Sequence, residues 1–114
     1  MKQDALSMTL LYDYYGELLT EKQKTCFDLH YNQDLSLGEI AQEAGISRQG
    51  VHDTLLRAEA LLKNMEDKTG CIARDRRVQL ALAEICEAAA ELADDPRSSA
   101  QARRILDAAE RIKE

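Results

Sequence analysis

The chain has 114 residues, which suits one domain of ordinary size that buries about 65% of the surface its unfolded form exposes. Hydrophobic residues make up 45% and charged residues 32%, with no Trp and a single Pro, a composition typical of a helical protein and not of a disordered or disulfide-built one. The formal net charge is -6, which disfavours a general nucleic-acid-binding surface.

The opening MKQDALSMTLLYDYY carries acids at Asp4 and Asp13. It has no basic start followed by a clean apolar run and no small-residue cleavage site, so it does not read as a signal peptide. No apolar run approaches the roughly 20 residues of a membrane span. We therefore expect no membrane span and a cytoplasmic location.

Apolar side chains at spacings of three and four predict a first helix that ends near Leu19. Its apolar stripe comprises Leu10, Leu11, Tyr14, Tyr15 and Leu18. In the following TEKQ, Thr20 and Gln23 form the reciprocal pattern of a capping box, so a second helix should run from about Glu21 to Tyr31. The aromatic residues at helical spacing favour a core between these two helices over base stacking. They are Tyr12, Tyr14, Tyr15, Phe27 and Tyr31.

A short third helix, residues 37–44, is predicted by a second capping box formed by Ser36 and Glu39. Gly45 ends it because glycine tolerates a positive φ, and Ser47 can then cap a fourth helix. The fourth helix should run from Arg48 until Thr69-Gly70 ends it. Its apolar seam comprises Val51, Leu55, Ala58, Leu62 and Met65.

The remaining sequence predicts two Ala-rich helices, the first over residues 71–93 and the last beginning at Ser98 or Ser99. Asp94-Asp95-Pro96 separates them. The seam of the first comprises Val78, Leu82, Ile85, Ala89 and Leu92, and that of the last comprises Ala102, Ile105, Ala109 and Ile112. Small side chains let helices approach closely, so the pair could form a hairpin, pack on the fourth helix or seal a homodimer.

We therefore predict an all-α fold with a helix-turn-helix region in residues 1–70 and a C-terminal helical extension in residues 71–114. The extension should pack on the first region to give one compact domain. An intramolecular bundle and a partly intermolecular one are both compatible with the seams.

The stretch SLGEIAQEAGISRQGVHDTLLRAE, Ser36 to Glu59, has the spacing of a helix-turn-helix. Two helices that cross over a tight turn need an apolar side chain, a small residue, a positive φ and two further core residues. Those positions are held by Ile40, Ala41, Gly45, Ile46 and Val51.

Together with LLYDYYGELLTEKQ, this stretch resembles region-four domains of bacterial sigma factors and, more closely, the YlxM family of small bacterial helix-turn-helix proteins. The resemblance covers about Leu10 to Gly70, where YDYYGELLT, SLGEIA and ISRQGVHD occur in the right order. It implies a non-catalytic role in the signal recognition particle pathway, with the particle's GTPase or its RNA as partner. His52 and Leu56 depart from the Tyr and basic residue that relatives tend to have on the exposed side of the recognition helix.

The outward face of the fourth helix follows from turning 100° per residue away from Val51. It comprises Gln49, His52, Asp53, Leu56, Arg57 and Ala60. Between Ser47 and Ala60 two basic residues balance two acidic ones, whereas tight DNA binders commonly make roughly six to ten phosphate contacts. DNA binding is therefore disfavoured by charge.

Three residues at the start of the fourth helix, Arg48, Gln49 and His52, are nevertheless candidate base or phosphate contacts. The alternative is that Gln49 and His52 are ordinary exposed polar residues. Leu56 favours a protein groove instead, and Arg57 lies beside it on the same face.

The densest basic run is ARDRR, with Arg74, Arg76 and Arg77. These three arginines oppose the dipole at the start of their helix, so RNA or an acidic protein surface is a candidate partner. A solvated turn with Asp75 as counter-ion is the alternative.

The three cysteines, Cys26, Cys71 and Cys86, are widely spaced and form no CxxC pair, which favours neither a zinc site nor disulfides. No Gly-rich phosphate loop, nucleophile with its base or distinct carboxylate pair is present, so we expect no catalysis and no cofactor. The leading hypothesis is a regulatory or accessory factor that binds the signal recognition particle GTPase or RNA. A dimeric DNA-binding transcription regulator and a structural protein adaptor that uses the Leu56 face are the alternatives.

Overall fold

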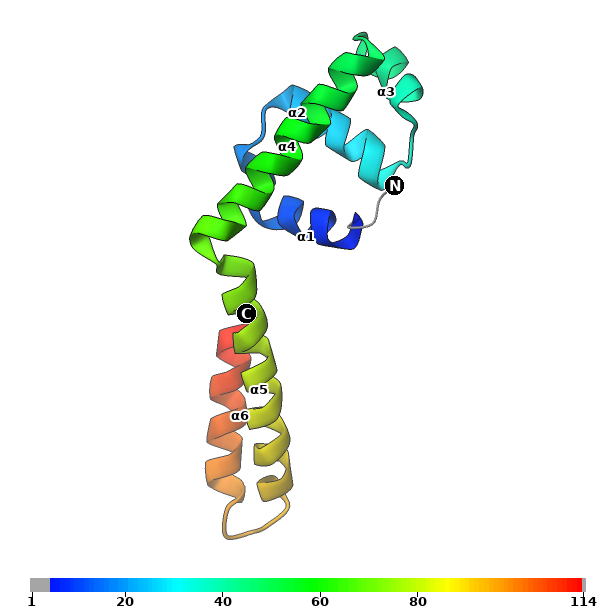
Figure 1. Ribbon diagram of the computed structural model, residues 1–114. Helices are drawn as coiled ribbons and strands as arrows, with labels where there is room; N and C mark the ends of the chain where they lie inside the picture. The colour runs from blue at the N-terminus through cyan, green and yellow to red at the C-terminus, as the bar shows by residue number, and fades with distance from the viewer. Residues whose placement is uncertain (1–4, 114) are drawn as a thin grey trace. The chain divides into compact units, whose positions relative to one another are not determined.

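The computed structural model describes residues 5–113, and these residues form α-helices with no strand, as an all-α fold predicts. The chain divides into two compact units, Met1–Ile72 and Ala73–Glu114 (Figure 1). The elements are α1 (Ala5–Tyr15), η1 (Gly16–Leu18), α2 (Glu21–Phe27), η2 (Asp28–Asn32), α3 (Leu37–Ala44), α4 (Arg48–Thr69), α5 (Cys71–Ala93) and α6 (Ser99–Lys113). The unit boundary lies close to the predicted one at Gly70. Packing of the extension on the first region stays a prediction.

The first helix departs from its predicted apolar stripe. Its buried face consists of Met8, Leu11, Tyr15 and Leu19. Leu10, Tyr14 and Leu18, which we placed in the stripe, are 43%, 40% and 54% exposed. The helix also ends at Tyr15 and continues as a 3-10 turn, which changes the angular position of the residues that follow.

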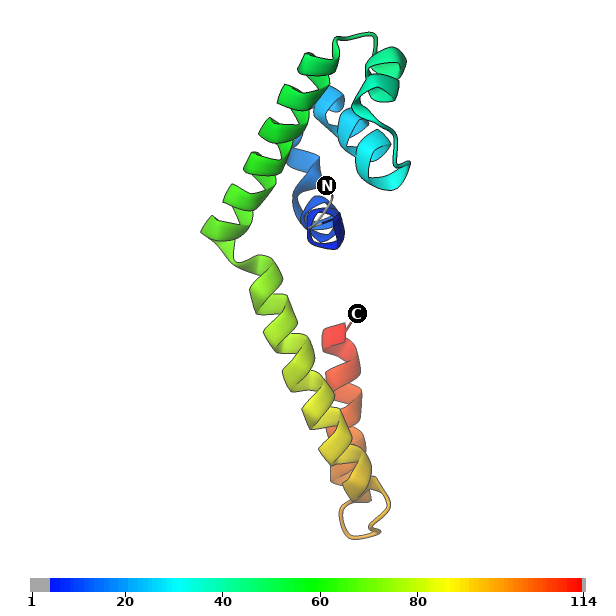
Figure 2. The same ribbon diagram turned by 45° about the vertical axis from the view of Figure 1, so that its right-hand side comes forward.

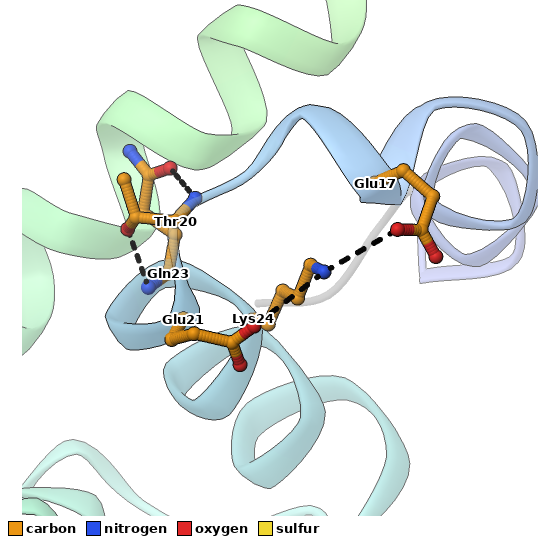
Figure 3. A network of polar contacts seen from close by, with 5 residues as sticks. All are labelled: Glu17, Thr20, Glu21, Gln23 and Lys24. Atoms are coloured by element: carbon orange, nitrogen blue, oxygen red, sulfur yellow. Dashed lines mark hydrogen bonds and ion pairs between the residues drawn. The ribbon is translucent and has the colours of Figure 1, made fainter.

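The capping box at Thr20 is confirmed (Figure 3). The backbone amide of Gln23 donates to Thr20 Oγ1 at 3.1 Å, and the backbone amide of Thr20 donates to the side-chain oxygen Oε1 of Gln23 at 2.9 Å. In the same view Lys24 Nζ lies 3.7 Å from a Glu17 carboxylate oxygen and 3.8 Å from one of Glu21. The box therefore fixes where α2 begins, while the ion pairs, whose carboxylates are exposed, add little.

The second helix is helical over its predicted length but changes type, since α2 ends at Phe27 and a π-helical turn, η2, carries the chain to Asn32. The predicted aromatic core is confirmed for the rings around Phe27, which is 1% exposed. Its ring centroid lies 4.8 Å from that of Tyr12 and 4.5 Å from that of Tyr31. Leu62 of α4 is fully buried in the same cluster.

The helix-turn-helix itself is built as the sequence predicts. Ser36 Oγ accepts from the Glu39 amide at 3.1 Å, and the Glu39 carboxylate accepts from the Ser36 amide at 2.9 Å. Gly45 adopts the left-handed conformation with φ 71°, and the Ser47 hydroxyl caps α4 by accepting from the Gly50 amide at 2.9 Å. The core between α2, α3 and α4 comprises Cys26, Ile40, Ala41, Val51 and Leu55.

The capping box at Ser36 makes stability depend on acid. Hydrogen bonds from the backbone amide and the side chain of Ser36 lower the pKa of Glu39 below its ordinary value. A carboxylate with a depressed folded pKa contributes stability that is present above its unfolded pKa of about 4.3 and is lost as the pH falls through the folded pKa. We therefore expect the box to weaken only in acid.

Ser36→Ala should lower the free energy of unfolding by about 1 kcal/mol at neutral pH, since the capping oxygen is lost. Glu39→Gln should keep the reciprocal hydrogen bond but remove its acid dependence, because glutamine does not titrate. Urea unfolding followed by circular dichroism at pH 7 and near pH 3 checks both changes. A Glu39→Gln variant with the same acid sensitivity as the parent would contradict this assignment.

The junction between α4 and α5 is bonded to α1 through a buried tyrosine. Tyr15 Oη donates to Glu66 Oε1 at 2.6 Å and lies 2.6 Å from Thr69 Oγ1. The same two oxygens accept hydrogen bonds from the first backbone amides of α5. The Ile72 amide donates to Glu66 Oε1 at 3.0 Å, and the Cys71 amide donates to Thr69 Oγ1 at 3.3 Å. Burial and the Glu66 contact raise the pKa of Tyr15, which keeps its hydroxyl a donor.

The second unit is an antiparallel hairpin in which α5 and α6 lie side by side (Figures 1 and 2). Its buried residues are Leu82, Ala89, Ala102 and Ala109. The other members of the two predicted seams are 37% to 61% exposed, so the hairpin by itself does not bury them. These members are Val78, Ile85, Leu92, Ile105 and Ile112.

Candidate partner-binding face of the recognition helix

The first half of α4 presents the outward face that the sequence predicts. The six residues assigned to it, Gln49, His52, Asp53, Leu56, Arg57 and Ala60, are all exposed. On the opposite side Val51, Leu55 and Ala58 are buried against α2 and α3 or against the cluster around Phe27. The face therefore rests on a rigid core, as a recognition surface requires.

The side chain of Gln49 is hydrogen-bonded within its own helix. Its Nε2 donates to Asp53 Oδ1 at 3.0 Å, one turn further along. A glutamine that reads adenine uses both its amide oxygen and its amide nitrogen, so this intrahelical bond competes with base reading. Asp53 also places a carboxylate at the centre of the face, where it would repel phosphates.

The charge of the face is low. The Tyr31 hydroxyl donates to Glu59 Oε2 at 2.6 Å, which holds this partly buried carboxylate at the side of α4. Arg48, Asp53 and Arg57 are then the exposed charges between Ser47 and Ala60. Two guanidinium groups and one carboxylate supply much less than the row of cations that duplex DNA requires.

Arg48 lies apart from the centre of the face, at the start of α4. Its side chain approaches Gly38, where an added Cβ would come within 3.9 Å of the Arg48 Nε. It lines an open groove with residues of α3 and of the turn. The groove has a volume of about 590 Å³ and is lined by Ser36, Gly38, Glu39, Ala41, Gln42, Ile46 and Arg48.

Leu56 is the large apolar residue of the face and is 51% exposed. An apolar side chain in this position has no favourable contact with phosphates but fits a groove on a protein. The exposed face also continues one turn beyond Ala60, through Lys63 and Asn64. The predicted face ended at Ala60, although the spacing of seven between these two residues and Leu56 and Arg57 places them on the same side.

The basic run of α5 lies in the second unit, and Arg74, Arg76 and Arg77 are all exposed there. At 100° per residue Arg74 and Arg77 point about 60° apart, whereas Arg76 points about 160° away from Arg74. The three guanidinium groups therefore do not form one patch. Each stays a candidate contact, and Arg74 with Arg77 is the pair that could act together.

The remaining chemistry of the described part of the chain is limited. Cys26 is buried, and its burial raises the pKa of the thiol, whereas Cys71 is exposed. Among residues 5–113 no group of three or more His, Cys, Asp and Glu side chains is placed to hold a metal ion. Over the same range no helix carries the sustained apolar stretch that would let it traverse a bilayer.

The geometry above is that of a helix-turn-helix, and the sequence pattern of the family described as YlxM/p13-like helix-turn-helix proteins, UPF0122, matches residues 2–101. The chain belongs to this family. The match extends well beyond Gly70, through α5 and into α6, so the family pattern includes most of the extension and not only the region from Leu10 to Gly70.

Individual members of the family are similar over most of their length. A UPF0122 protein of Thermoanaerobacter sp. is 51% identical over 85 residues, which cover 75% of this chain and 73% of the relative. One of Halalkalibacterium halodurans is 42% identical over 88 residues, with 77% and 81% covered. One of Bacillus mycoides is 34% identical over 112 residues, with 98% and 99% covered. The match to the Bacillus mycoides relative therefore spans the sequence of both compact units.

Proposed function

We propose that this chain is a non-catalytic regulatory or accessory factor of the signal recognition particle pathway, which works in the cytoplasm and binds the particle's GTPase, its RNA or both. The observation that carries the proposal is the outward face of α4. Leu56 is half-exposed there, and Gln49 is bonded to Asp53 on a scaffold of helix-turn-helix geometry. The identity of the partner rests on the resemblance to the YlxM family, and the binding surface rests on α4.

The α4 face favours a protein groove over duplex DNA as the primary partner. Leu56 offers apolar area, while Arg57 and Lys63 flank it and can pair with acidic residues at the rim of an interface. RNA contact would instead use the exposed arginines, above all Arg74 and Arg77 of α5. The two contacts involve different units, so they can be measured separately.

Binding to the signal recognition particle GTPase is the decisive test. Immobilised GTPase, with and without its RNA, should retain the full-length chain at micromolar concentration. Retention without RNA supports contact through the α4 face, and strict dependence on RNA points to Arg74 and Arg77. Absence of retention in both arms, at about 50 mM salt where charged contacts are strongest, contradicts the proposal.

The alternative is a dimeric DNA-binding transcription regulator, and the exposure of Arg48, Gln49 and His52 at the start of α4 is the observation that favours it. Electrostatic binding to random duplex DNA is strongest at low salt. A fluorescence anisotropy titration with random duplex DNA at about 50 mM salt should therefore detect binding if this alternative holds. We expect none up to about 10 μM protein, since the first 70 residues hold 7 Lys and Arg against 12 Asp and Glu.

A further inference from the structure

The hairpin of α5 and α6 leaves an apolar face uncovered. Between them the two helices bury Leu82, Ala89, Ala102 and Ala109, three of which are alanines. Five larger apolar side chains stay 37% to 61% exposed on the same two helices. They are Val78, Ile85 and Leu92 of α5 and Ile105 and Ile112 of α6, and we refer to them as the hairpin face.

These five residues lie on one side of the hairpin. At 100° per residue, Val78, Ile85 and Leu92 are rotated by about 40° to 80° from Leu82, which marks the direction of α6. Ile105 and Ile112 are rotated by about 60° and 80°, in the same sense along the chain, from Ala102, which marks the direction of α5. Because the two helices are antiparallel, equal rotations along the chain turn both sets toward the same side.

The apolar residues of α5 are spaced as in a helix that packs against two other helices. The buried row, Leu82 and Ala89, repeats every seven residues, and its burial marks the side of α5 that is turned toward α6. A second row, Val78, Ala81, Ile85, Ala88 and Leu92, alternates by three and four and is exposed throughout. In a two-helix hairpin one apolar row per helix is enough, whereas helices of a four-helix bundle carry the wider stripe that α5 shows.

We propose that the hairpin face packs against the same face of a second copy of this chain, so that two hairpins form an antiparallel four-helix bundle around a twofold axis. A 42-residue hairpin with four buried side chains is too small to be stable alone, and association is the usual remedy at this size. A face that meets its own copy must be self-complementary. This inference goes beyond the proposed function, because a dimer is compatible with a protein, an RNA or a DNA partner.

The charges beside the hairpin face are complementary in one arrangement. The outer edge of α5 carries Glu84 and Glu91, and the outer edge of α6 carries Arg104 and Arg111, all exposed. When α5 lies over α6 of the second copy, each acidic edge meets a basic edge, and the twofold axis makes this happen twice. When α5 lies over its own equivalent, Glu84 faces Glu84. Arg77 lies on the same edge of α5, near its N-terminal end, so the charge of the edge is positive there and negative at Glu84 and Glu91.

Sedimentation velocity of the full chain from about 1 to 100 μM tests the dimer. The parent should sediment as a dimer at the upper end of this range, and Ile85→Glu combined with Ile105→Glu should weaken the dimer at least 100-fold. Leu80→Glu is the matched control, because Leu80 is 64% exposed on α5 but points to the opposite side. A parent that stays monomeric at 100 μM, including one whose hairpin face is covered by its own first unit, overturns the proposal. A dimer that survives the double substitution does so too.

A charge exchange tests the interface without touching the apolar core, in case the double substitution unfolds the hairpin. Glu84→Arg alone and Arg104→Glu alone should each weaken the dimer about tenfold, since each places like charges together at two symmetric positions. The combination should restore affinity to within about threefold of the parent. Within one hairpin the two edges point away from each other, so rescue can only arise between copies, and additive losses in the combined variant exclude this arrangement.

Discussion

Replacing Phe27 with alanine should lower the free energy of unfolding of the first unit by about 3–5 kcal/mol. The ring is 1% exposed, is stacked on Tyr12 and meets the ring of Tyr31 at a tilt, so its removal leaves a cavity and also ends both aromatic contacts. Small domains have a total stability of roughly 5–15 kcal/mol. This single truncation should therefore remove a large part of the stability that holds α1 and α2 on α4.

Urea unfolding monitored by circular dichroism measures this change, and two further variants bracket it. Phe27→Leu keeps most of the buried volume and should cost less than about 2 kcal/mol. Leu18→Ala removes an apolar side chain that is 54% exposed and should stay within about 0.5 kcal/mol of the parent. A Phe27→Ala loss no larger than that of Leu18→Ala would mean that the cluster around Phe27 does not hold the first unit together.

Phe27 lies at the boundary between the two cores of the first unit, which is why we expect its loss to have a large effect. Its neighbour Cys26 is fully buried in the other cluster, with Ile40 and Val51 of the helix-turn-helix. Adjacent residues of α2 thus belong to two separate cores, one toward α1 and one toward α3. Loss of the Phe27 core should disturb the attachment of α1 first. It should also affect the recognition helix, because α4 contributes residues to both clusters.

The helix boundaries were the most predictable part of the fold. Residues 37–44, 48–69 and 71–93 begin and end where predicted, because local chemistry alone marks those ends. The marks are Ser36, Gly45, Ser47, Gly70 and Asp94-Asp95-Pro96. The 3-10 turn after Tyr15 and the π turn after Phe27 carry no such mark. They depend on how the chain is held by tertiary contacts, which local sequence patterns do not contain.

Burial was less predictable than helicity. In α1, Leu10 and Leu11 are adjacent in sequence and about 100° apart on the helix, so the pattern permits two stripes, and only contact with α2 and α4 selects the one with Leu11. In α5 and α6 the residues of the predicted seams do alternate by three and four. Every second one is buried in the hairpin, and the residues between them are exposed. A sequence pattern identifies an apolar row without stating whether the same chain covers it.

The candidate site was predictable as a face and not as a set of contacts. Rotation from Val51 places the six outward residues correctly, since a helix is a rigid geometric object. The bond between Gln49 and Asp53 depends on side-chain conformations. The bond between Glu59 and Tyr31 depends on a residue 28 positions away in the sequence. The bond between Gln49 and Asp53 lowers the suitability of the face for base reading, whereas the contact of Glu59 with Tyr31 removes one acidic charge from the face and leaves too few cations for duplex DNA.

Leu56→Glu should lower the affinity of the chain for its protein partner at least tenfold, because a carboxylate would replace the apolar side chain at the centre of the α4 face. Leu56 is 51% exposed, so the substitution leaves the core intact and should change stability by less than about 0.5 kcal/mol. Isothermal titration calorimetry with the signal recognition particle GTPase provides the measurement. Leu18→Glu is the matched control, since Leu18 is 54% exposed on η1, outside this face, and should bind like the parent.

Leu56→Lys distinguishes a protein groove from a nucleic acid at the same position. An apolar groove should reject lysine and glutamate alike, so both variants should lose affinity. A phosphate backbone should instead bind the lysine variant more tightly and the glutamate variant more weakly, with the gain disappearing as salt rises. Opposite responses of Leu56→Lys and Leu56→Glu, measured with the GTPase alone and with the RNA alone, would therefore assign the α4 face to RNA and contradict a protein groove.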